Sequence, residues 1–472
     1  MAFPNRTYQM GTKIPKTVQE SEDISTDDLP KGWALTSVGE LFQIVGGGTP
    51  STKNPEYWKG NIPWISSADI YGLKKIVPRR SINQNAIKNS AAHLVPKGSI
   101  IVVTRVSLGR VAICDTPISF SQDCHALIPK TDSVDPEFAL FYLSQAVQTF
   151  QSQSRGTTIS GVTVNVVSSL PFPLPPLAEQ QHIVARVEAL LMHINAARDR
   201  LSRVPLIMKK FRQAVLATAC SGKLTDGWRG ENPSAEPATV LLEKISVQQE
   251  KKKIDHLKKM EPLNGELNDL PENWSWTQIG FITESMKNGV YKTPDFYKDD
   301  GFPCLRMYNI EDGTIVWKNI KHMDLTEDEI NTYLLKQNDI LINRVNSREL
   351  VGKSALMTEK IEPCVYESKN IRLRMYNEEI CSQYAVYWLQ VNAQKYFNLN
   401  AQQTVGMASI NQDQIASMPI PLPPLAEQHE IVRRVGLLFE RADAIDREVV
   451  AAGRRCERLT QAVLGKAFAG KL

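Results

Sequence analysis

Three short stretches of the sequence hold residue types that occur in catalytic sites. Residues 54–57 (NPEY) are similar to the NPPY motif of adenine methyltransferases, but Glu replaces the second proline and no glycine-rich cofactor-binding turn precedes them. Residues 352–354 (GKS) match the end of a phosphate-binding loop, but Ser347 stands where its first glycine is required. His125 follows Cys124, and no third side chain completes a nucleophile triad. The sequence therefore predicts no catalytic residue.

The residue types that bind metals are scattered along the chain. The seven histidines lack ligand spacings and the seven cysteines form no CxxC pair, so neither a metal site nor a disulfide framework is indicated. A net charge of +4 permits nucleic-acid binding without requiring it. The sequence has no signal-peptide core and no apolar run of about 18 residues, so we expect a cytoplasmic protein without membrane contact.

A stretch that occurs twice determines the architecture. Residues 171–187 (PFPLPPLAEQQHIVARV) and 419–435 (PIPLPPLAEQHEIVRRV) are identical at 13 of 17 positions at an offset of 248 residues. The same offset continues without a gap to residues 213–224 and 461–472, so the chain contains a long internal repeat. The prolines favour an extended segment, and a helix can begin directly after them with a glutamate in its first turn.

Each proline segment is followed by a long stretch with the apolar spacing of a helix. In the first copy the apolar positions are Val187, Leu190, Ile194, Ala197, Leu201, Val204, Met208, Phe211 and Val215. Their heptad spacing, repeated in the second copy, favours a seam between the two helices, and the alternative is that each helix packs on its own domain. Pro205 and Gly453 occupy matching places, so we expect a kink or fraying there in both helices.

A second repeat opens each globular part. Residues 29–39 (LPKGWALTSVG) match residues 270–280 (LPENWSWTQIG) at an offset of 241. Further along, IVVTRV (101–106) faces ILINRV (340–345), and short β-branched runs between Gly, Pro and Asn predict strands. We therefore expect an α+β protein with two similar globular domains, each followed by a long helix, and an antiparallel coiled coil of the two helices.

These repeats divide the chain into six segments. The expected segments are a polar N-terminal arm (1–28), a first globular domain (29–170), the first proline segment and long helix (171–224), a linker with a short basic helix (225–269), a second globular domain (270–418), and the second proline segment and long helix (419–472).

Two diverged domains joined by paired helices suit a DNA target in two parts. B-DNA has two-fold axes perpendicular to its length, so two related domains on one duplex are best related by such an axis, which makes a helical spacer antiparallel. A helix of about 40 residues is at most ~60 Å long, more than one DNA turn of ~34 Å. The sequence therefore predicts two different half-sites separated by an unread gap.

The duplicated PLPPLAEQ segment and helix, the LPxxW opening and the GGGTP…IPWI stretch (46–65) resemble a known family. Over nearly all of residues 29–472 the chain is similar to the specificity (S) subunit of type I restriction–modification systems. The resemblance implies a non-catalytic subunit whose two target-recognition domains each read one half of an asymmetric split site on double-stranded DNA. It also implies two methyltransferase (M) subunits that use S-adenosylmethionine, and restriction (R) subunits that use ATP and Mg²⁺ if they join. No cofactor is expected in this chain itself.

The candidate DNA contacts are polar residues near the glycine-rich loop and the IVVTRV run, together with their counterparts. Arginine can fork onto guanine, asparagine can pair with adenine, and hydroxyls or lysine can bind phosphate. In the first domain the candidates are Gly47, Gly48, Thr49, Ser51, Lys53, Arg105, Ser107 and Arg110. In the second domain they are Asn288, Tyr291, Lys292, Asn343, Arg344, Asn346 and Arg348. The alternative for each arginine is an ion pair inside its own domain.

Two further groups complete the candidate sites. Thr157, Thr158 and Ser160 are candidate phosphate contacts before the proline segment. The repeated corners Leu177, Ala178, Glu179, Gln180 and Leu425, Ala426, Glu427, Gln428 are candidates for binding a partner subunit or for fastening each domain to its helix. Two other classes of protein stay open: an enzyme that depends on S-adenosylmethionine or metal, and a coiled-coil adaptor that binds proteins alone.

Overall fold

The computed structural model describes residues 29–105, 109–153, 162–252, 263, 267–400, 402–404 and 407–472. These residues form two compact units. Unit 1 contains the described residues up to Ser202 together with Val450–Leu472, and unit 2 contains Arg203–Val449. Each unit consists of one globular head and the helices that pack on it.

The head of unit 1 is built mainly from short strands. They are β1 (Ala34–Ser37), β2 (Phe42–Gly46), β3 (Ile62–Ile65), β4 (Ile70–Gly72), β5 (Lys75–Ile76), β6 (Arg80–Ile82), β7 (Leu94–Val95), β8 (Ile100–Val103), β9 (Val111–Ile113), β10 (Ile118–Phe120), β11 (Cys124–Pro129) and β12 (Pro171–Leu174). Its helices are α1 (Val38–Leu41), α2 (Gln84–Lys88), α3 (Pro136–Gln153), α4 (Val164–Ser168) and α5 (Leu177–Leu201), with 3₁₀ turns at η3 (Pro55–Trp58) and η4 (Ser67–Asp69).

The head of unit 2 repeats this composition. Its strands are β13 (Ser275–Gln278), β14 (Thr283–Asn288), β15 (Tyr297–Leu305), β16 (Ile310–Glu311), β17 (Thr314–Ile315), β18 (Lys321–Met323), β19 (Ile340–Asn343), β20 (Val345–Asn346), β21 (Ser354–Leu356), β22 (Val365–Tyr366), β23 (Asn370–Met375), β24 (Gln402–Thr404), β25 (Met407–Ser409) and β26 (Pro419–Leu422). Its helices are α6 (Val204–Cys220), α7 (Asp226–Glu231), α8 (Ala238–Lys252), α9 (Glu327–Tyr333), α10 (Ser382–Asn400) and α11 (Gln412–Ala416), with 3₁₀ turns at η6 (Lys223–Thr225), η8 (Pro294–Phe296) and η9 (Met307–Asn309).

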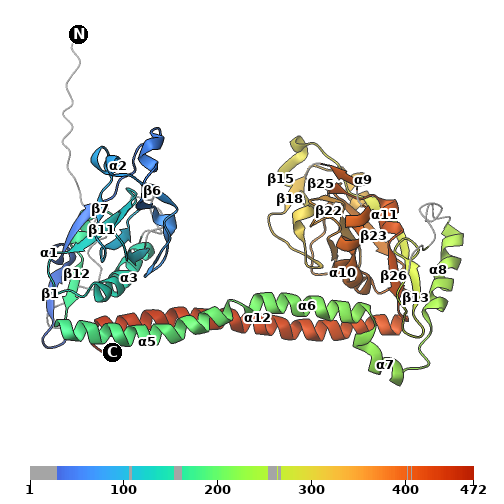
Figure 1. The fold of residues 1–472 in the computed structure, drawn as a ribbon. Helices are drawn as coiled ribbons and strands as arrows, with labels where there is room; N and C mark the ends of the chain where they lie inside the picture. The colour runs from blue at the N-terminus through green and yellow to red at the C-terminus, as the bar shows by residue number, and fades with distance from the viewer. Residues whose placement is uncertain are drawn as a thin grey trace, which may run out of the picture. The chain divides into compact units, whose positions relative to one another are not determined.

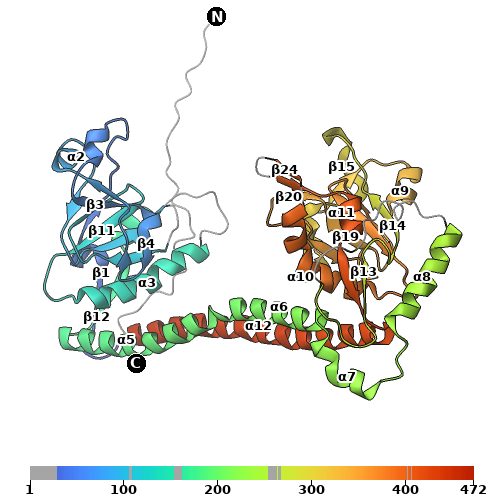
Figure 2. The same ribbon diagram turned by 45° about the vertical axis from the view of Figure 1, so that its right-hand side comes forward.

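The two heads share one sheet topology. The strand order β2-β11-β8-β9 in unit 1 corresponds to β14-β23-β19-β21 in unit 2, and β6-β3-β10 corresponds to β18-β15-β22. The two-stranded sheet β1-β12, which joins the start of the head to the proline segment, corresponds to β13-β26. Figures 1 and 2 show α3 beside the strands of the first head and α10 beside those of the second. The α+β repeat expected from the sequence is therefore confirmed.

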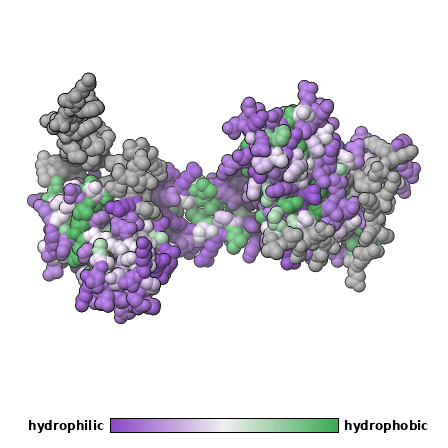
Figure 3. Space-filling model, turned by 90° about the horizontal axis from the view of Figure 1, so that it is seen from above, coloured by the Kyte–Doolittle hydropathy of each residue, from purple (hydrophilic) through white to green (hydrophobic). Residues whose placement is uncertain are grey.

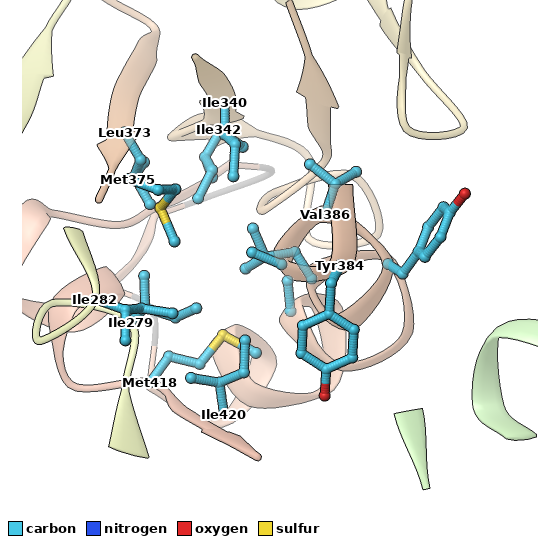
Figure 4. Close-up of a cluster of buried hydrophobic side chains, with 14 of the residues drawn as sticks. Ile279, Ile282, Ile340, Ile342, Leu373, Met375, Tyr384, Val386, Met418 and Ile420 are labelled. Atoms are coloured by element: carbon cyan, nitrogen blue, oxygen red, sulfur yellow. The ribbon is translucent and has the colours of Figure 1, made fainter. Parts of the chain in front are cut away.

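The central strand of each head is buried on both faces. In β8, Ile100 and Val102 belong to one apolar cluster, and Ile101 and Val103 belong to another. This split follows from the alternation of side chains along a strand. In unit 2, Ile340 and Ile342 join the larger cluster, in which Figure 4 shows isoleucine, leucine and methionine side chains from strands and adjoining loops facing Tyr384 and Val386 of α10. Each head thus has a core of its own.

The long helices pack antiparallel, as predicted. α12 (Leu425–Phe468) is one helix whose residues belong to both units. In unit 2, Arg212 of α6 pairs with Asp443 and Asp446 of α12, whereas Arg434 donates to the carbonyl of Leu224 at 2.8 Å, so the numbering runs in opposite directions. In unit 1, α5 lies beside the last part of α12 (Figures 1 and 2) and shares an apolar cluster with it.

The helix ends also pack on the heads at repeated positions. Leu464, Ala467 and Phe468 of α12 join the core of the first head, and the ring of Phe468 lies 5.3 Å from the rings of both Phe138 and Tyr142. At the same offset of 248 residues, Leu216, Ala219 and Cys220 of α6 join the core of the second head. The seam prediction was therefore incomplete, because part of the repeated apolar register contacts a head.

Other predicted seam positions are exposed. Leu190 is 41% exposed and Leu459 is 54% exposed, whereas Val187 is fully buried. Two paired helices cover only part of each other's apolar surface. The apolar stripe on each long helix is wider than this contact, so some of its side chains stay exposed among the described residues.

The matching positions Pro205 and Gly453 behave differently. The first helix is interrupted at Ser202–Arg203, between α5 and α6, because Pro205 has no N–H to donate to the carbonyl four residues earlier. α12 continues through Gly453 without a break. The expected fraying at Gly453 was wrong, because glycine keeps its N–H and costs a helix about 1 kcal/mol, whereas proline costs about 3 kcal/mol.

Candidate nucleic-acid interface

The glycine-rich loop of the first head is a packing element. The Gly47 N–H donates to the carbonyl of Cys124 at 3.1 Å, and the Gly48 N–H donates to the carbonyl of Phe120 at 2.9 Å. A Cβ at Gly47 would overlap the carbonyl of Ser121, and a Cβ at Gly48 would overlap that of Ala91. Glycine is therefore required here by the head itself, whether or not DNA approaches this loop.

The second head uses glycine in the same way. Gly289 donates to Asn370 at 3.1 Å, and Val290 donates to Tyr366 at 2.9 Å, in the pattern made by Gly47 and Gly48. A Cβ at Gly289 would overlap the carbonyls of Tyr366 and Glu367. These bonds make Thr49 and Tyr291 structural counterparts.

The loop that follows Gly48 leads to a tryptophan. Thr49 and Lys53 are exposed, and the Thr49 hydroxyl donates to Gln122. The Trp58 indole donates to the carbonyl of Ser51 at 3.3 Å. Asn54 caps η3 by accepting a bond from the Glu56 N–H, so the NPEY stretch forms a helix cap and no methyltransferase motif.

Trp58 and a second tryptophan hold Arg80. The rings of Trp58 and Trp64 meet edge to face, with centroids 5.1 Å apart, and Trp64 donates to the carbonyl of Gly48 at 3.1 Å. The Arg80 guanidinium lies over Trp58, 5.2 Å from the ring centroid. The buried Trp64 thus supports a stacked, exposed arginine.

The turn after β3 holds a second arginine. Asp69 accepts bonds from the N–H and the hydroxyl of Ser66, both at 2.8 Å, and pairs with the Nε of Arg79. Burial alone would raise the pKa of Asp69, but the hydrogen bonds from Ser66 and Arg79 outweigh it and the pKa lies below its ordinary value. Asp69 is therefore a carboxylate that fixes Arg79, whose side chain remains 58% exposed.

Arg110, a predicted DNA contact, supports the same turn. Its guanidinium donates to the carbonyls of Ser67 and Ile70 at 3.0 and 3.2 Å. These bonds occupy one end of the side chain inside the head.

The two arginines open onto a cleft of about 750 Å³. Its lining residues carry two guanidinium groups, an indole, an amide and hydroxyls, and no carboxylate. They are Thr52, Trp58, Asn61, Pro63, Pro78, Arg79, Arg80 and Ser81. The predicted residues Ser51 and Lys53 flank Thr52 in the chain, so the cleft adjoins part of the predicted site. The guanidinium, indole, amide and hydroxyl groups offer many hydrogen-bond donors and no negative charge, which suits a base edge or a phosphate.

In the second head, the residues after Gly289 are partly paired. Tyr291 is 78% exposed, whereas Lys292 pairs with Glu329 at 2.6 Å and lies over the ring of Phe296. Asn288 is exposed and accepts a bond from Gln412 at 3.1 Å.

Two predicted contacts of the second head, Asn343 and Asn346, are buried. Asn343 donates to Lys369 and to the side chain of Asn370, and Asn346 donates to the side-chain oxygen of Asn343 at 2.8 Å. In this structure both amides join a network inside the head. Arg348 is exposed on the following loop, and Arg344 is half-buried.

The alignment of IVVTRV with ILINRV was wrong by one residue. Val103 pairs with Cys124, and Asn343 pairs with Asn370 at the equivalent place of the other sheet. The Thr104 N–H then donates to Asp123 at 2.9 Å, as the Arg344 N–H donates to Lys369 at 2.8 Å. Arg344 is therefore the counterpart of Thr104, and its side chain does not occupy the place of Arg105.

The remaining predicted contacts are divided between exposed and undescribed residues. Arg105 is exposed beside His125, whose pKa is lowered by burial and then by the charge of Arg105. Ser107, Thr157, Thr158 and Ser160 lie outside the described residues.

The residues considered for catalysis lie in surroundings that do not suit the chemistry suggested by their sequence motifs. Burial raises the pKa of the Cys124 thiol to about 12, which removes its nucleophilic form at neutral pH. Ser354 begins strand β21, whereas a phosphate-binding loop requires a helix there. Among the described residues, no group of three His, Cys, Asp or Glu side chains could hold a metal ion.

The two corners fasten each head to its helix. The Trp33 indole donates to Glu179 at 3.0 Å, and the Trp274 indole donates to Glu427 at 2.8 Å. Gln180 bonds to Ser133, Asp135 and Pro175, while Gln428 bonds to Cys381 and Pro423.

These contacts favour the head-to-helix role for the glutamates and glutamines. Gln180, Glu427 and Gln428 are fully buried, so their side chains are closed to another subunit in this structure. Leu177, Ala178 and Ala426 are exposed and Leu425 is half-buried, so these neighbours remain candidates for partner contact.

Sequence reasoning missed the residues around the cleft. Trp58, Arg79 and Arg80 line it, and Arg306 occupies the corresponding turn of the second head. The adjacent arginines at 79 and 80 were a visible signal, but they have no repeated counterpart in the second copy.

Comparison with known proteins identifies the repeated unit. The sequence profile of the "Type I restriction modification DNA specificity domain" matches residues 30–203 and 271–447, one match for each head with the first part of the helical segment that follows it. The specificity subunit of the type I restriction enzyme EcoKI from Escherichia coli K12 is 28% identical over 95% of this chain and 91% of its own length. That of StySPI from Salmonella potsdam is 28% identical over 94% of this chain and 90% of its own length.

Solved structures show the same fold. A chain from a study of complex assembly and conformational transition of the type I R-M system aligns with a TM-score of 0.66 and 21% identity, over 94% of this chain and 99% of that chain. The HsdS subunit from Thermoanaerobacter tengcongensis aligns with a TM-score of 0.50 and 21% identity, over 94% and 98%. Among the residues that the structure describes, no helix has the length and apolar character needed to cross a membrane.

Proposed function

The chain belongs to the family of type I restriction–modification specificity subunits, and from this premise we propose that its two heads each read one half of a split, asymmetric DNA site. The family's specificity subunit supplies DNA recognition and not catalysis. In this chain residues 29–170 and 270–418 would be the two target-recognition domains.

One observation carries the proposal. The heads have the same strand order and the same glycine-supported loop, but their exposed polar residues differ. Arg79 and Arg80 lie beside the turn after β3, with Arg80 over the ring of Trp58, whereas the turn after β15 begins with Arg306, which lies over the ring of Tyr308. A common frame with different donors on its surface is what two unlike half-sites require, because base identity is read by donor and acceptor patterns.

The paired helices would act as the spacer between the two heads. Support comes from their antiparallel packing in each unit and from the repeated attachment of helix ends to the heads. A helix rises 1.5 Å per residue and cannot be compressed, so the number of residues would select the length of the unread gap.

The helices would also bind two methyltransferase subunits, which would methylate adenines from S-adenosylmethionine, and two restriction subunits if these join with ATP and Mg²⁺. On α6, Leu206 is 60% exposed and Ile207 is 56% exposed, and Leu437 on α12 is 47% exposed. Figure 3 shows hydrophobic patches (green) within a surface that is otherwise mostly hydrophilic. Exposed apolar side chains of this kind suit an obligate partner. This chain would hold no cofactor and would work in the cytoplasm, where its DNA is.

The test is methylome sequencing of a host that expresses this chain with its cognate methyltransferase subunit. We expect a methyladenine signature in a split motif with two different halves. Exchange of residues 29–170 for the corresponding head of a relative should change one half and leave the other. A complex that assembles but methylates no defined motif would contradict DNA reading by this chain.

A further inference from the structure

The cleft of the first head contains an arginine held in one orientation. The Nε of Arg79 donates to Asp69, a carboxylate whose side chain is 5% exposed. The bond to Asp69 uses the Nε of Arg79. Among the described residues it leaves the two terminal Nη groups of Arg79 available to a ligand. Because Asp69 is in turn fixed by two bonds from Ser66, the direction of the guanidinium plane is set before any ligand arrives.

The corresponding turn of the second head also holds an arginine through a buried carboxylate. The two turns match because Val77 donates to the carbonyl of Asp69 and Val316 donates to that of Asn309, both at 2.9 Å. In the second turn, the Nε of Arg306 donates to Glu367 at 3.1 Å, and the Glu367 side chain is 6% exposed.

The two arginines reach the turn from different parts of the chain. Arg79 comes from the loop before β6, whereas Arg306 is the first residue of the turn itself. Their carboxylates also differ, because Asp69 lies on the turn and Glu367 follows β22. Two rings accompany Arg306, which lies 5.4 Å from the ring centroid of the exposed Tyr308 and 5.8 Å from that of the half-buried Tyr297. Both turns therefore hold an arginine through a buried carboxylate, but the residues that form the pair come from different positions.

We propose, on the basis of the function proposed above, that Arg79 in the first head and Arg306 in the second are specificity-determining residues that each read a G·C base pair in the major groove. The Nη groups would donate to the two acceptors, O6 and N7, that guanine presents on its edge. Since the two guanidiniums are set differently on the common turn, they would read G·C pairs at different places in the two half-sites.

The ion pairs favour a base over a phosphate as the ligand. A guanidinium paired with a buried carboxylate carries little net charge, so its attraction for phosphate is reduced. The ion pair does not change the planar arrangement of the N–H donors of the guanidinium. A fixed planar pair of donors suits two adjacent neutral acceptors, such as those on the edge of a base. Among the described residues, no carboxylate pairs with Arg80, which lies over the ring of Trp58, so no ion pair offsets its positive charge.

The experiment uses the complex of the full chain with its methyltransferase subunits. The wild-type methylome first provides the motif, and binding is then measured on duplexes in which each pair of the motif is replaced in turn. Lysine variants remove the fork and keep the charge. We expect R79K to lose discrimination of about 5- to 140-fold at one G·C pair of one half-site, and R306K to do so in the other half-site.

Two controls separate base reading from other effects. Lys97→Ala removes an exposed cation of the first head outside the cleft, and it should leave every preference unchanged. Assembly with the methyltransferase subunits, and intact reading of the opposite half-site, report that each variant is folded.

Three results would overturn the inference. They are half-sites without a G·C pair, lysine variants that discriminate like the wild type, and a change from Arg79 to Ala that weakens all duplexes equally, which is the mark of a phosphate contact. A wild-type complex that yields no motif would instead remove the proposed function, and the inference with it.

Discussion

Two glutamates at the same repeated position have different surroundings. Glu427 is fully buried and accepts bonds from Trp274 and Thr225 as well as pairing with Arg229, whose side chain is 17% exposed. Glu179 is half-buried and accepts a bond from Trp33. The motif residue is therefore shared, but its electrostatic role depends on the segment that packs beside it.

This difference predicts unequal effects of one substitution. Glu427→Gln keeps an acceptor for Trp274 but removes the buried carboxylate that pairs with Arg229 and leaves this cation beside the exposed Asp226, so it should destabilise the second head by about 3 kcal/mol. Glu179→Gln should cost the first head about 1 kcal/mol or less, because the amide oxygen can still accept from Trp33. Hydrogen exchange of the β1-β12 and β13-β26 ladders measures each head separately.

A control distinguishes charge from packing in this prediction. Adding Arg229→Met to Glu427→Gln removes the cation that has lost its buried partner and should recover part of the lost protection. Equal losses for the two single variants would show that the Arg229 pair contributes nothing beyond the tryptophan bond.

At the scale of elements, Pro205 determines where the first long helix is interrupted, and ion pairs lie near the start of α12. Pro205 separates α5 from α6, while α12 passes Gly453 unbroken. Near the start of α12, Glu430 forms ion pairs with Arg433 and Arg434 at 2.7 and 2.6 Å. The hydrogen bond from Arg433, with that from Arg434, lowers the pKa of Glu430 from 4.5 to about 2.

The lowered pKa predicts an acid-dependent contribution to helix stability. A depressed carboxylate pKa stabilises the fold fully above the unfolded value of 4.5, and this contribution is lost as the pH falls towards 2. The difference in protection of the α12 amides between wild type and Glu430→Gln should therefore shrink from pH 5 to about pH 2. A difference that does not change over this range would show that the ion pairs are not the cause.

At the scale of the whole molecule, the proposed spacer predicts how the target changes. Four helical residues add about 6 Å, or one to two base pairs of DNA at 3.4 Å each. Matched insertions of four residues into α5 and into the facing part of α12 should lengthen the preferred gap by that amount, with both half-sites unchanged. Methylome sequencing of the variant reads the gap directly.

A single insertion provides the contrast. Four residues added to α5 alone would misalign the packed helices, so we expect loss of assembly or of methylation and no new gap length. An unchanged gap after the matched insertion would rule out the helices as the spacer.

The repeats in the sequence predicted the frame of the molecule. The offset of 248 residues defined two matching long helical segments, and the offset of 241 defined where each head begins. The heptad spacing and the prolines were local signals, so the helices and the extended segments before them followed from the sequence.

Long-range contacts were decided by the tertiary structure. The repeated tryptophans and glutamates were visible separately, but that Trp33 bonds to Glu179 and Trp274 to Glu427, about 150 residues apart, requires the folded chain. The one-residue error at Arg344 has the same origin, because the strand register is set by pairing with β23 and not by similarity of letters.

The candidate DNA-reading residues also depended on the tertiary structure. Internal repetition reveals what both heads share, which is the core, the glycines and the helix corners. A reading surface is selected to differ between the heads, so Arg79 and Arg306 leave no repeated signal. Their common feature is a fixed guanidinium beside a buried carboxylate, and this feature exists in space and not in the order of residues.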